Sequence, residues 1–479
     1  MAERKQKLEL TWIGKENRPK LEPRILLEDP ERSYHAKHRV TDKDIFDNRL
    51  IYGDNLLALK ALEAEFAGKV KCVLIDPSSF LEQRNFTPRC IMQVPAIYHG
   101  REQAFVKHHL LETYLQRLFI IIGQHQKSIR YVDCFSGPWR EESADLHDTS
   151  IGIALNIIGK CREGLKKMGK DVTFHALFIE KDENSFQKLQ DYLAGSPQQE
   201  VAAEARPGDF FDLRETILEW CGPDDFTFFF IDPTGWKNVV EIPTLTPLLL
   251  RPNSEFLLNF MYDFLLRTHT QEPFQKDMEA IFGEVPDTEG LSPEEKEAYL
   301  LNLYRKRIKE ILPAWGGKPR SVSVPVLYPT INRTLYHLVY LTRHPKGITV
   351  FMHESEKLDI VQRRARAQAK QENRESRSGQ RELFPAATFV HKEKRADLVK
   401  VKAYWLDRLQ ATARLFGIED LADMLEETGW FESDFQAAFG ELEKEGRVKN
   451  LDARGKRRKR FVHFDAPGNK SERLMRLTP

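Results

Sequence analysis

The chain has few cysteines and no extended apolar run. Its five cysteines are dispersed without any C-x-x-C spacing, a pattern that argues against a disulfide framework and a zinc site and fits a reducing compartment. The longest apolar runs, such as residues 118–122, are far too short to span a bilayer, and no apolar signal-peptide core follows the charged N-terminus. We therefore expect a soluble protein of the cytoplasm.

A net charge of either sign is also lacking, because 73 basic residues balance 72 acidic ones to leave +1. Any affinity for nucleic acid must then come from local basic patches and not from the field of the whole chain. The 479 residues, 41% of them hydrophobic and 10% aromatic, exceed what a single core can hold. The length predicts two to four packed domains.

The densest apolar stretch, residues 226–231, is Phe-Thr-Phe-Phe-Phe-Ile and is followed by Asp232 and Pro233. Such a run predicts a strand buried on both faces, and ligands bind at the carboxyl ends of strands in open α/β sheets. Asp232 and the carbonyl of Pro233 are suited to orient an exocyclic base amine, and Trp236 offers a surface on which a flipped base can stack. A core strand followed by an ordinary Asp-Pro turn is the alternative interpretation.

Three other predicted strand ends carry an acid. These acids are Asp133 near the end of a strand at residues 129–135, Glu180 directly after a strand at 173–179, and Asp209 in a short element at 205–211. In a nucleoside-binding Rossmann-like domain the carboxylate after the second strand accepts from two ribose hydroxyls, and Glu180 occupies that position. Because the strands alternate with helical segments, we expect an α/β fold with a parallel-type sheet and helices on both faces.

Four acids at successive strand ends are the layout of a methyltransferase that uses S-adenosyl-L-methionine. The expected cofactor-binding residues are Asp133, Phe135, Gly137, Glu180 and Asp209, the last of them facing the adenine amine. The glycine turn after the first strand lets the backbone approach the cofactor closely. Pro138 and Trp139 make this loop stiffer and bulkier than the glycine-rich loop usual in that class.

The rest of the central region predicts further regular elements. We expect helices at residues 99–122, 150–167, 184–193 and 293–311, strands at 255–260 and 335–343, and a turn at 344–347. His108 and His109 lie on the first of these helices, but no partner with metal-ligand spacing accompanies them. We therefore predict no metal site.

The central region also resembles a known family, the three-Cys-motif partner proteins. The resemblance is carried by Lys-His-His-Leu-Leu-Glu-Thr-Tyr-Leu at 107–115, Tyr-Val-Asp-Cys-Phe-Ser-Gly-Pro at 131–138, Phe-Ile-Glu-Lys-Asp at 178–182, Gly-Asp-Phe-Phe at 208–211 and Phe-Phe-Ile-Asp-Pro-Thr-Gly-Trp at 229–236. It runs from about residue 98 to the C-terminus. The resemblance implies a methyltransferase-like fold and, as a partner, a three-cysteine-motif protein encoded nearby.

The first 94 residues resemble the start of a different family. Leu-Ile-Tyr-Gly-Asp-Asn-Leu-Leu-Ala-Leu-Lys-Ala-Leu at 50–62 and Lys-Val-Lys-Cys-Val-Leu-Ile-Asp-Pro at 69–77 are similar to the modification subunits of type III restriction systems, which resemble adenine-N6 DNA methyltransferases. That family continues with Asp-Pro-Pro-Tyr, whereas this chain has Asp76-Pro77-Ser78-Ser79. We expect a short βαβ fragment that serves as a docking or scaffold element.

The C-terminal part predicts a charged linker and a small DNA-binding fold. Residues 355–381 are rich in Arg and Gln and predict a solvated helix that ends as a linker. Beyond residue 396 we expect helices at 418–427 and 431–445 and then a hairpin whose strands include Val448 and residues 461–464. This order is that of a winged helix. The expected nucleic-acid contacts, at the tip of the wing, are Arg454, Lys456, Arg457, Arg458, Lys459 and Arg460.

We expect a truncated N-terminal segment at residues 1–94 and a Rossmann-like methyltransferase domain at 95–345. A charged helical linker at 346–395 and a winged helix at 396–479 follow. The functional hypothesis is a methyltransferase that acts on an exocyclic base amine of nucleic acid, of the adenine-N6 type, with DNA favoured over RNA. The alternative is a methyltransferase-like scaffold without activity, which binds DNA and assists a three-cysteine-motif protein in a restriction or defence assembly.

Overall fold

The computed structural model describes residues 94–137, 149–195, 201–233, 239–314, 316–380, 396–455, 458–464 and 471–477, together with isolated positions elsewhere. The chain forms two compact units, Met1–Arg89 and Cys90–Pro479, and only the second is described at length. The βαβ fragment predicted for the first unit, including Asp76, lies outside the described residues.

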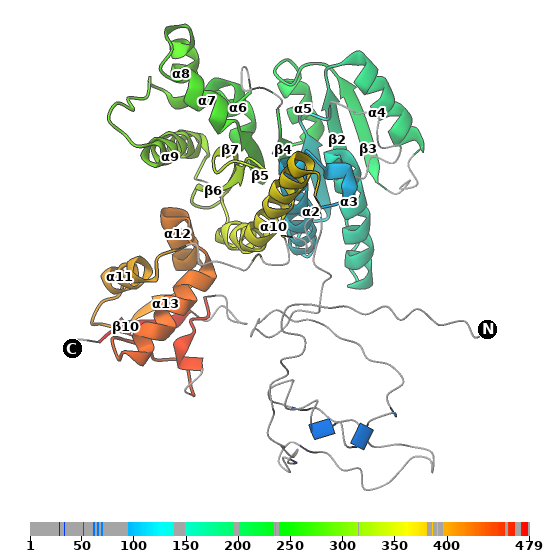
Figure 1. Cartoon of the computed structure of the whole chain (residues 1–479). Helices are drawn as coiled ribbons and strands as arrows, with labels where there is room; N and C mark the ends of the chain where they lie inside the picture. Colours follow the sequence, from blue (N-terminus) through cyan, green and yellow to red (C-terminus); the bar gives the residue numbers. More distant parts are fainter. Residues whose placement is uncertain are drawn as a thin grey trace. The chain divides into compact units, whose positions relative to one another are not determined.

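A seven-stranded sheet with the order β3-β2-β1-β4-β5-β7-β6 is the centre of the second unit (Figure 1). Its strands are β1 (Ser128–Asp133), β2 (Thr173–Glu180), β3 (Ala202–Pro207), β4 (Phe226–Ile231), β5 (Ser254–Phe260), β6 (Arg320–Leu327) and β7 (Thr334–Thr342). Strands β1 to β5 are mutually parallel, and β7 runs antiparallel to both β5 and β6. The parallel core with one reversed strand confirms the predicted α/β, Rossmann-like fold.

The central strands form where the sequence is continuously apolar. Every residue of β4 and β5 is buried, as expected for parallel strands covered on both faces. Sequence analysis missed β6, in which two serines and Pro325 interrupt the apolar residues. A proline is tolerated there because β6 lies at the edge of the sheet.

One face of the sheet is covered by α2 (Glu102–Ile122), α3 (Ser150–Lys167) and α10 (Pro345–Ser378), whose apolar residues join those of the strands in one core. Figure 1 shows α10 crossing α2 in front of the strands. The predicted turn at 344–347 is wrong. The helix predicted at 355–381 is confirmed as part of α10, but the prediction that it is solvated is wrong. His344 instead caps α10, and Leu358, Val361, Ala365 and Ala369 form a narrow buried stripe among its charged residues.

The opposite face carries a second core. It is built from α5 (Arg214–Cys221), α6 (Ile242–Leu249), α7 (Tyr262–Thr268), α8 (Gln275–Phe282) and α9 (Pro293–Ile311), while α4 (Glu183–Gly195) follows β2. Helix α9 has the predicted bounds because Ser292 and Glu295 form a capping box at its start. No helix among the described residues is both long and apolar enough to cross a membrane.

The C-terminal part is a winged helix. It comprises α11 (Leu398–Arg408), β8 (Arg414–Phe416), α12 (Ile418–Thr428), α13 (Glu432–Lys444), β9 (Val448–Asn450) and β10 (Glu472–Arg476), with the antiparallel order β8-β10-β9. The buried Trp405 packs on Phe435 and Phe439 and donates its indole N–H to the carbonyl of Phe435 at 2.9 Å. Helices α12 and α13 confirm the predicted helix pair.

The predicted second strand of the wing at 461–464 is wrong. The partner of β9 is β10, where Leu474 faces Asn450. Val462 and Phe464 are buried instead, and the backbone N–H of Val462 donates to Gln436 of α13 at 2.9 Å. The alternating apolar residues of this segment are thus buried against a helix and not in a sheet. The alternating pattern alone does not distinguish these two cases.

Candidate active site at the carboxyl edge of the sheet

Strand register places three of the predicted acids at one edge of the sheet. Asp133 is level with Phe178 of β2 and with Phe230 of β4. Glu180 and Asp232 each follow two residues later, so both project from the same face as Asp133 at equivalent positions on either side of β1. This is the face that α2 and α3 cover.

Asp133 is fully buried at the end of β1 and is held by two hydrogen bonds. One oxygen accepts from the Ser150 hydroxyl at 2.6 Å, and the other accepts from the backbone N–H of Phe135 at 3.1 Å. Burial raises the pKa of Asp133 to about 7, although both hydrogen bonds oppose the rise; nearby Asp232 adds to it and Lys107 reduces it. Asp133 therefore ties the start of α3 to the strand.

This raised pKa predicts a pH-dependent contribution to stability. Because the folded-state pKa lies above the unfolded value, the contribution is complete below the unfolded pKa and is lost as the pH rises through about 7. The free energy of unfolding should fall by about 1 kcal/mol between about pH 6 and about pH 8 on account of this group alone. Asp133→Asn should remove that part of the slope in urea titrations; equal slopes in both proteins would contradict the assignment.

Glu180 lies against the loop that follows β1. It is nearly buried, one of its oxygens accepts from the backbone N–H of Asp182 at 2.7 Å, and the β1 end is joined to β2 by Ser136 N–H donating to the Ile179 carbonyl at 2.8 Å. A methyl group added at Gly137 would lie 1.9 Å from the other carboxylate oxygen. Gly137 is therefore required for the backbone to pass over this carboxylate.

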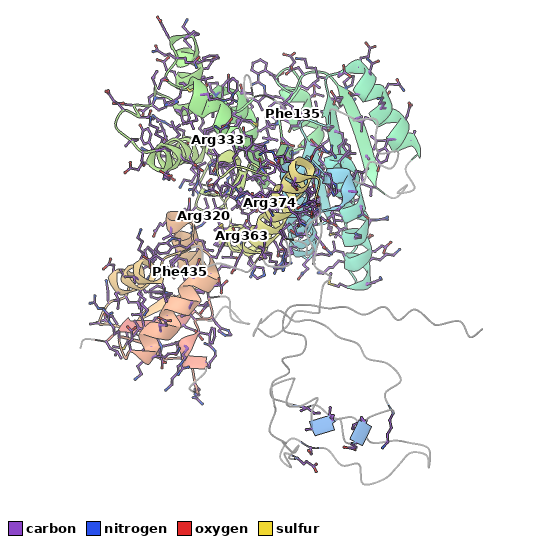
Figure 2. All side chains as sticks on the ribbon, viewed as in Figure 1. Phe135, Arg320, Arg333, Arg363, Arg374 and Phe435 are labelled. Carbon is purple, nitrogen blue, oxygen red and sulfur yellow. The ribbon has the colours of Figure 1, made fainter. Side chains whose placement is uncertain are left out.

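Phe135, labelled in Figure 2, leaves β1 beside Asp133 and packs its ring on Phe210 at a centroid distance of 5.2 Å. Asp209 precedes Phe210 and lies partly exposed at the rim of the same edge, where it accepts from Lys181 at 2.7 Å and from the backbone N–H of Phe211 at 2.8 Å. The bond from Lys181 holds the pKa of Asp209 below its usual range. The structure thus brings Asp209 near the Glu180 end of the sheet, paired with a cation.

Asp232 is held by two residues that sequence analysis did not assign. Lys107 of α2 forms an ion pair with one carboxylate oxygen, and Asn259 at the end of β5 donates its amide N–H to the other at 2.7 Å. The side-chain oxygen of Asn259 is buried and has no hydrogen-bond partner among the described residues. Pro233 is buried directly after Asp232, whereas Trp236 and Trp139 lie outside the described residues.

An unpartnered buried acceptor is costly unless a ligand completes it, because a desolvated carbonyl oxygen loses its bonds to water. The Asn259 oxygen belongs to the same amide that contacts Asp232, so it lies beside that carboxylate. Two acceptors side by side match the two hydrogens of a primary amine. The only sequence signal for Asn259 was its position as a polar residue in an apolar strand.

Two of the six wing cations predicted to bind nucleic acid already lie beside acidic side chains. Arg458 is paired with Glu472 and donates to the carbonyl of Phe461, and Arg460 lies 3.7 Å from Glu443. Arg454 is exposed and Lys459 is half-buried. Lys456 and Arg457 lie outside the described residues.

Comparisons with known proteins give a domain and distant likenesses. A family model described as the GMT-like wHTH domain matches residues 370–455, and no curated protein matches the chain. Protein LPL1258 from Legionella pneumophila str. Philadelphia 1, of the family DUF519, aligns with 53% of this chain and 89% of its own at 10% identity and a TM-score of 0.30. A loganic acid methyltransferase with SAH aligns with 56% of this chain and 67% of its own at 14% identity and a TM-score of 0.23.

The strand order and the C-terminal domain together define the architecture. The chain combines a Rossmann-like α/β fold with a winged helix-turn-helix domain.

Proposed function

We propose that this chain is an S-adenosyl-L-methionine-dependent methyltransferase that acts on an exocyclic base amine of nucleic acid, of the adenine-N6 type and with DNA preferred. The observation that carries the proposal is the pair of acceptors at the end of β4 and β5. The Asp232 carboxylate and the Asn259 oxygen, which has no hydrogen-bond partner within the described part of the chain, lie side by side at the edge where Glu180 and Asp133 also project.

The residues around Gly137 fit a nucleoside cofactor. The backbone at Gly137 passes directly over the Glu180 carboxylate, a cradle that any side chain would fill, and a carboxylate there can accept from two ribose hydroxyls. Phe135 supplies an apolar surface and Asp209 an acceptor for an adenine amine. When bound, S-adenosyl-L-methionine supplies an activated methyl group on sulfur.

The chain's own residues would orient the amine that receives the methyl group. Asp232 and Asn259 would accept its two N–H groups and so orient the nitrogen lone pair for attack on the activated methyl group. The proton then lost from nitrogen is taken at a carboxylate oxygen of Asp232. In this proposal Pro233 contributes its carbonyl, and Trp236 stacks on the extruded base.

Gly137→Ala should weaken binding of the cofactor by about 10- to 100-fold, because hydrogen bonds to a charged group contribute about 1.5–3 kcal/mol and the added methyl displaces the Glu180 carboxylate. The fold should survive, since the clash is with the end of a side chain and not with backbone. Isothermal titration and urea unfolding measure the two effects. Gly164→Ala, whose methyl would meet only the Ile120 side chain at 3.4 Å, is the matched control.

The proposal is tested by transfer of labelled methyl groups from S-adenosyl-L-methionine to mixed DNA and RNA. Label should enter nucleic acid, mainly DNA, and digestion should recover it on the exocyclic nitrogen of a base. Cofactor binding without any incorporation into either nucleic acid would rule out nucleic acid as the substrate. Absence of cofactor binding at millimolar concentration would rule out the methyltransferase activity as well.

One observation favours the second candidate, a scaffold that binds DNA and assists a three-cysteine-motif protein. Both oxygens of Asp232 already have partners, Lys107 and Asn259, as a purely structural carboxylate would. On that hypothesis the pair holds α2 to the sheet and no amine displaces it. Titration with S-adenosyl-L-methionine separates the two candidates, because the scaffold gives no heat of binding.

A further inference from the structure

The helix pair of the winged helix is acidic. In a helix-turn-helix domain the second helix enters the major groove of DNA, and the phosphates around it favour cations. Here α12 carries five acidic residues and no basic one, and α13 carries four acidic residues and a single lysine. Helix α13 is therefore poorly suited to a phosphate backbone by itself.

Acidic side chains of helix α12 form ion pairs with basic side chains of the sheet domain. Arg320 at the start of β6 bonds Glu419 at 2.6 Å and Asp423 at 2.7 Å, and Lys309 bonds Glu426 at 2.6 Å. The acidic charge of α12 is thus used to fix the winged helix to the Rossmann-like domain. Cations for a nucleic acid must come from another surface near α13.

Such a surface lines a cavity of about 440 Å³ where α2, α10 and the winged helix meet. The sheet domain contributes Arg117, Lys346 and His353, and the winged helix contributes Gln436, Phe461 and His463. Phe461 is 45% exposed, which is unusual for a phenylalanine beside a cavity that cations line. The volume lies within the range of about 300–1,000 Å³ typical of small-molecule sites.

Charge in the cavity is compatible with an anion. Glu432 is the one acidic residue among the described residues that line it, and burial raises the pKa of Glu432, which favours its neutral form. Arg117 also bonds the buried Glu354 at 2.7 Å, so its remaining N–H groups are the ones that face the cavity ligand. Burial lowers the pKa of Lys346 and of His353, so both groups gain from a phosphate that stabilises their charged forms.

We propose that this cavity binds a nucleotide unit of a single-stranded nucleic acid, with its phosphate against Arg117, Lys346 and His353 and its base stacked on Phe461. Cationic grooves with aromatic platforms bind single strands in this way. The inference shares its class of ligand with the proposed function but uses none of the residues at the carboxyl edge of the sheet. On this proposal the winged helix binds nucleic acid through a cavity that it shares with α2 and α10, and not by inserting a helix into the major groove of DNA.

The test is fluorescence anisotropy of the full chain with labelled single-stranded DNA and RNA in the absence of methyl donor. Lys346→Glu and Phe461→Ala should each weaken binding by about tenfold, and Lys346→Glu should also reduce the salt slope by about one. Lys160→Glu, the same charge change at an exposed position of α3, should bind as the wild type does. Urea unfolding of each variant shows whether the fold is retained.

Other outcomes are equally decisive. Unchanged binding in Lys346→Glu and Phe461→Ala, or loss of binding in Arg454→Glu alone, would overturn the proposal and place the strand on the wing. Wild-type protein that binds duplex but no single strand would also overturn it. Titration with adenosine monophosphate decides whether a free nucleotide suffices. Lys346→Glu should bind S-adenosyl-L-methionine as the wild type does, because Lys346 lies in α10 and not at the carboxyl edge of the sheet, so failure of the catalytic proposal is distinguishable from failure of this one.

Discussion

Replacing Asp232 by asparagine should lower the rate of methyl transfer by about 100- to 1,000-fold, the loss typical when one preorganised polar group is removed from an active site. Asparagine keeps the shape of the side chain but has one acceptor oxygen instead of two. Its amide nitrogen would face either the Lys107 ammonium or the Asn259 amide, both of them donors to the present carboxylate. The target amine would lose one of its two acceptors. Initial rates of label incorporation at saturating cofactor measure the effect.

Measuring cofactor binding shows whether the substitution at Asp232 affects only the methyl-transfer step. Asp232→Asn should bind S-adenosyl-L-methionine within about twofold of the wild type, because Glu180 and Gly137 lie on the other side of β1. Asp171→Asn, at an exposed position before β2, makes the same chemical change away from the edge and should be fully active. A variant at Asp232 with wild-type rates of methyl transfer would show that Asp232 does not orient the target amine.

Much of the sheet could be predicted from the sequence, because its parallel strands are fully buried. The apolar run of β4 and the bounds of α3 and α9 follow from periodicity and capping alone. Strand β6 and the start and buried face of helix α10 could not be predicted in the same way. Their apolar residues are interrupted by polar ones, and their burial depends on neighbours far away in the chain.

The candidate site also contains residues that could be predicted from the sequence and residues that could not. Asp133, Glu180 and Asp232 were predictable because an acid at the end of a buried strand leaves a local signal in the sequence. Lys107 and Asn259 were not, since Lys107 precedes Asp232 by 125 residues and Asn259 follows it by 27. Only the packing of α2 and β5 beside β4 brings them to the carboxylate. A residue that completes a site from another element has no local signal of its role.

Arg320→Met should lower the free energy of unfolding by about 3 kcal/mol, at the low end of the range for breaking a buried ion pair. The Arg320 side chain, labelled in Figure 2, is only 1% exposed and bonds Glu419 and Asp423, with Glu426 at 3.5 Å. Methionine fills most of the volume but leaves the carboxylates of α12 without their shared guanidinium. Lys309 and Lys318 still contact Glu426 and Asp423, which limits the loss. Urea unfolding at neutral pH measures it.

Burial, and not the number of ion pairs, is what makes Arg320 important, and a matched substitution separates the two explanations. Arg333 also forms a close ion pair, with Asp263 at 2.9 Å, but its side chain is half-exposed. Water and salt screen the exposed guanidinium, and Arg267 and Tyr328 still contact the buried Asp263, so Arg333→Met should unfold close to the wild type. Added salt should weaken the wild-type Arg320–Asp423 contact little, because the guanidinium is buried and Asp423 is largely buried, and it should act mainly on the exposed Glu419. A loss in Arg320→Met as small as that expected for Arg333→Met would show that the Arg320 ion pairs are not needed to hold α12 against the sheet domain.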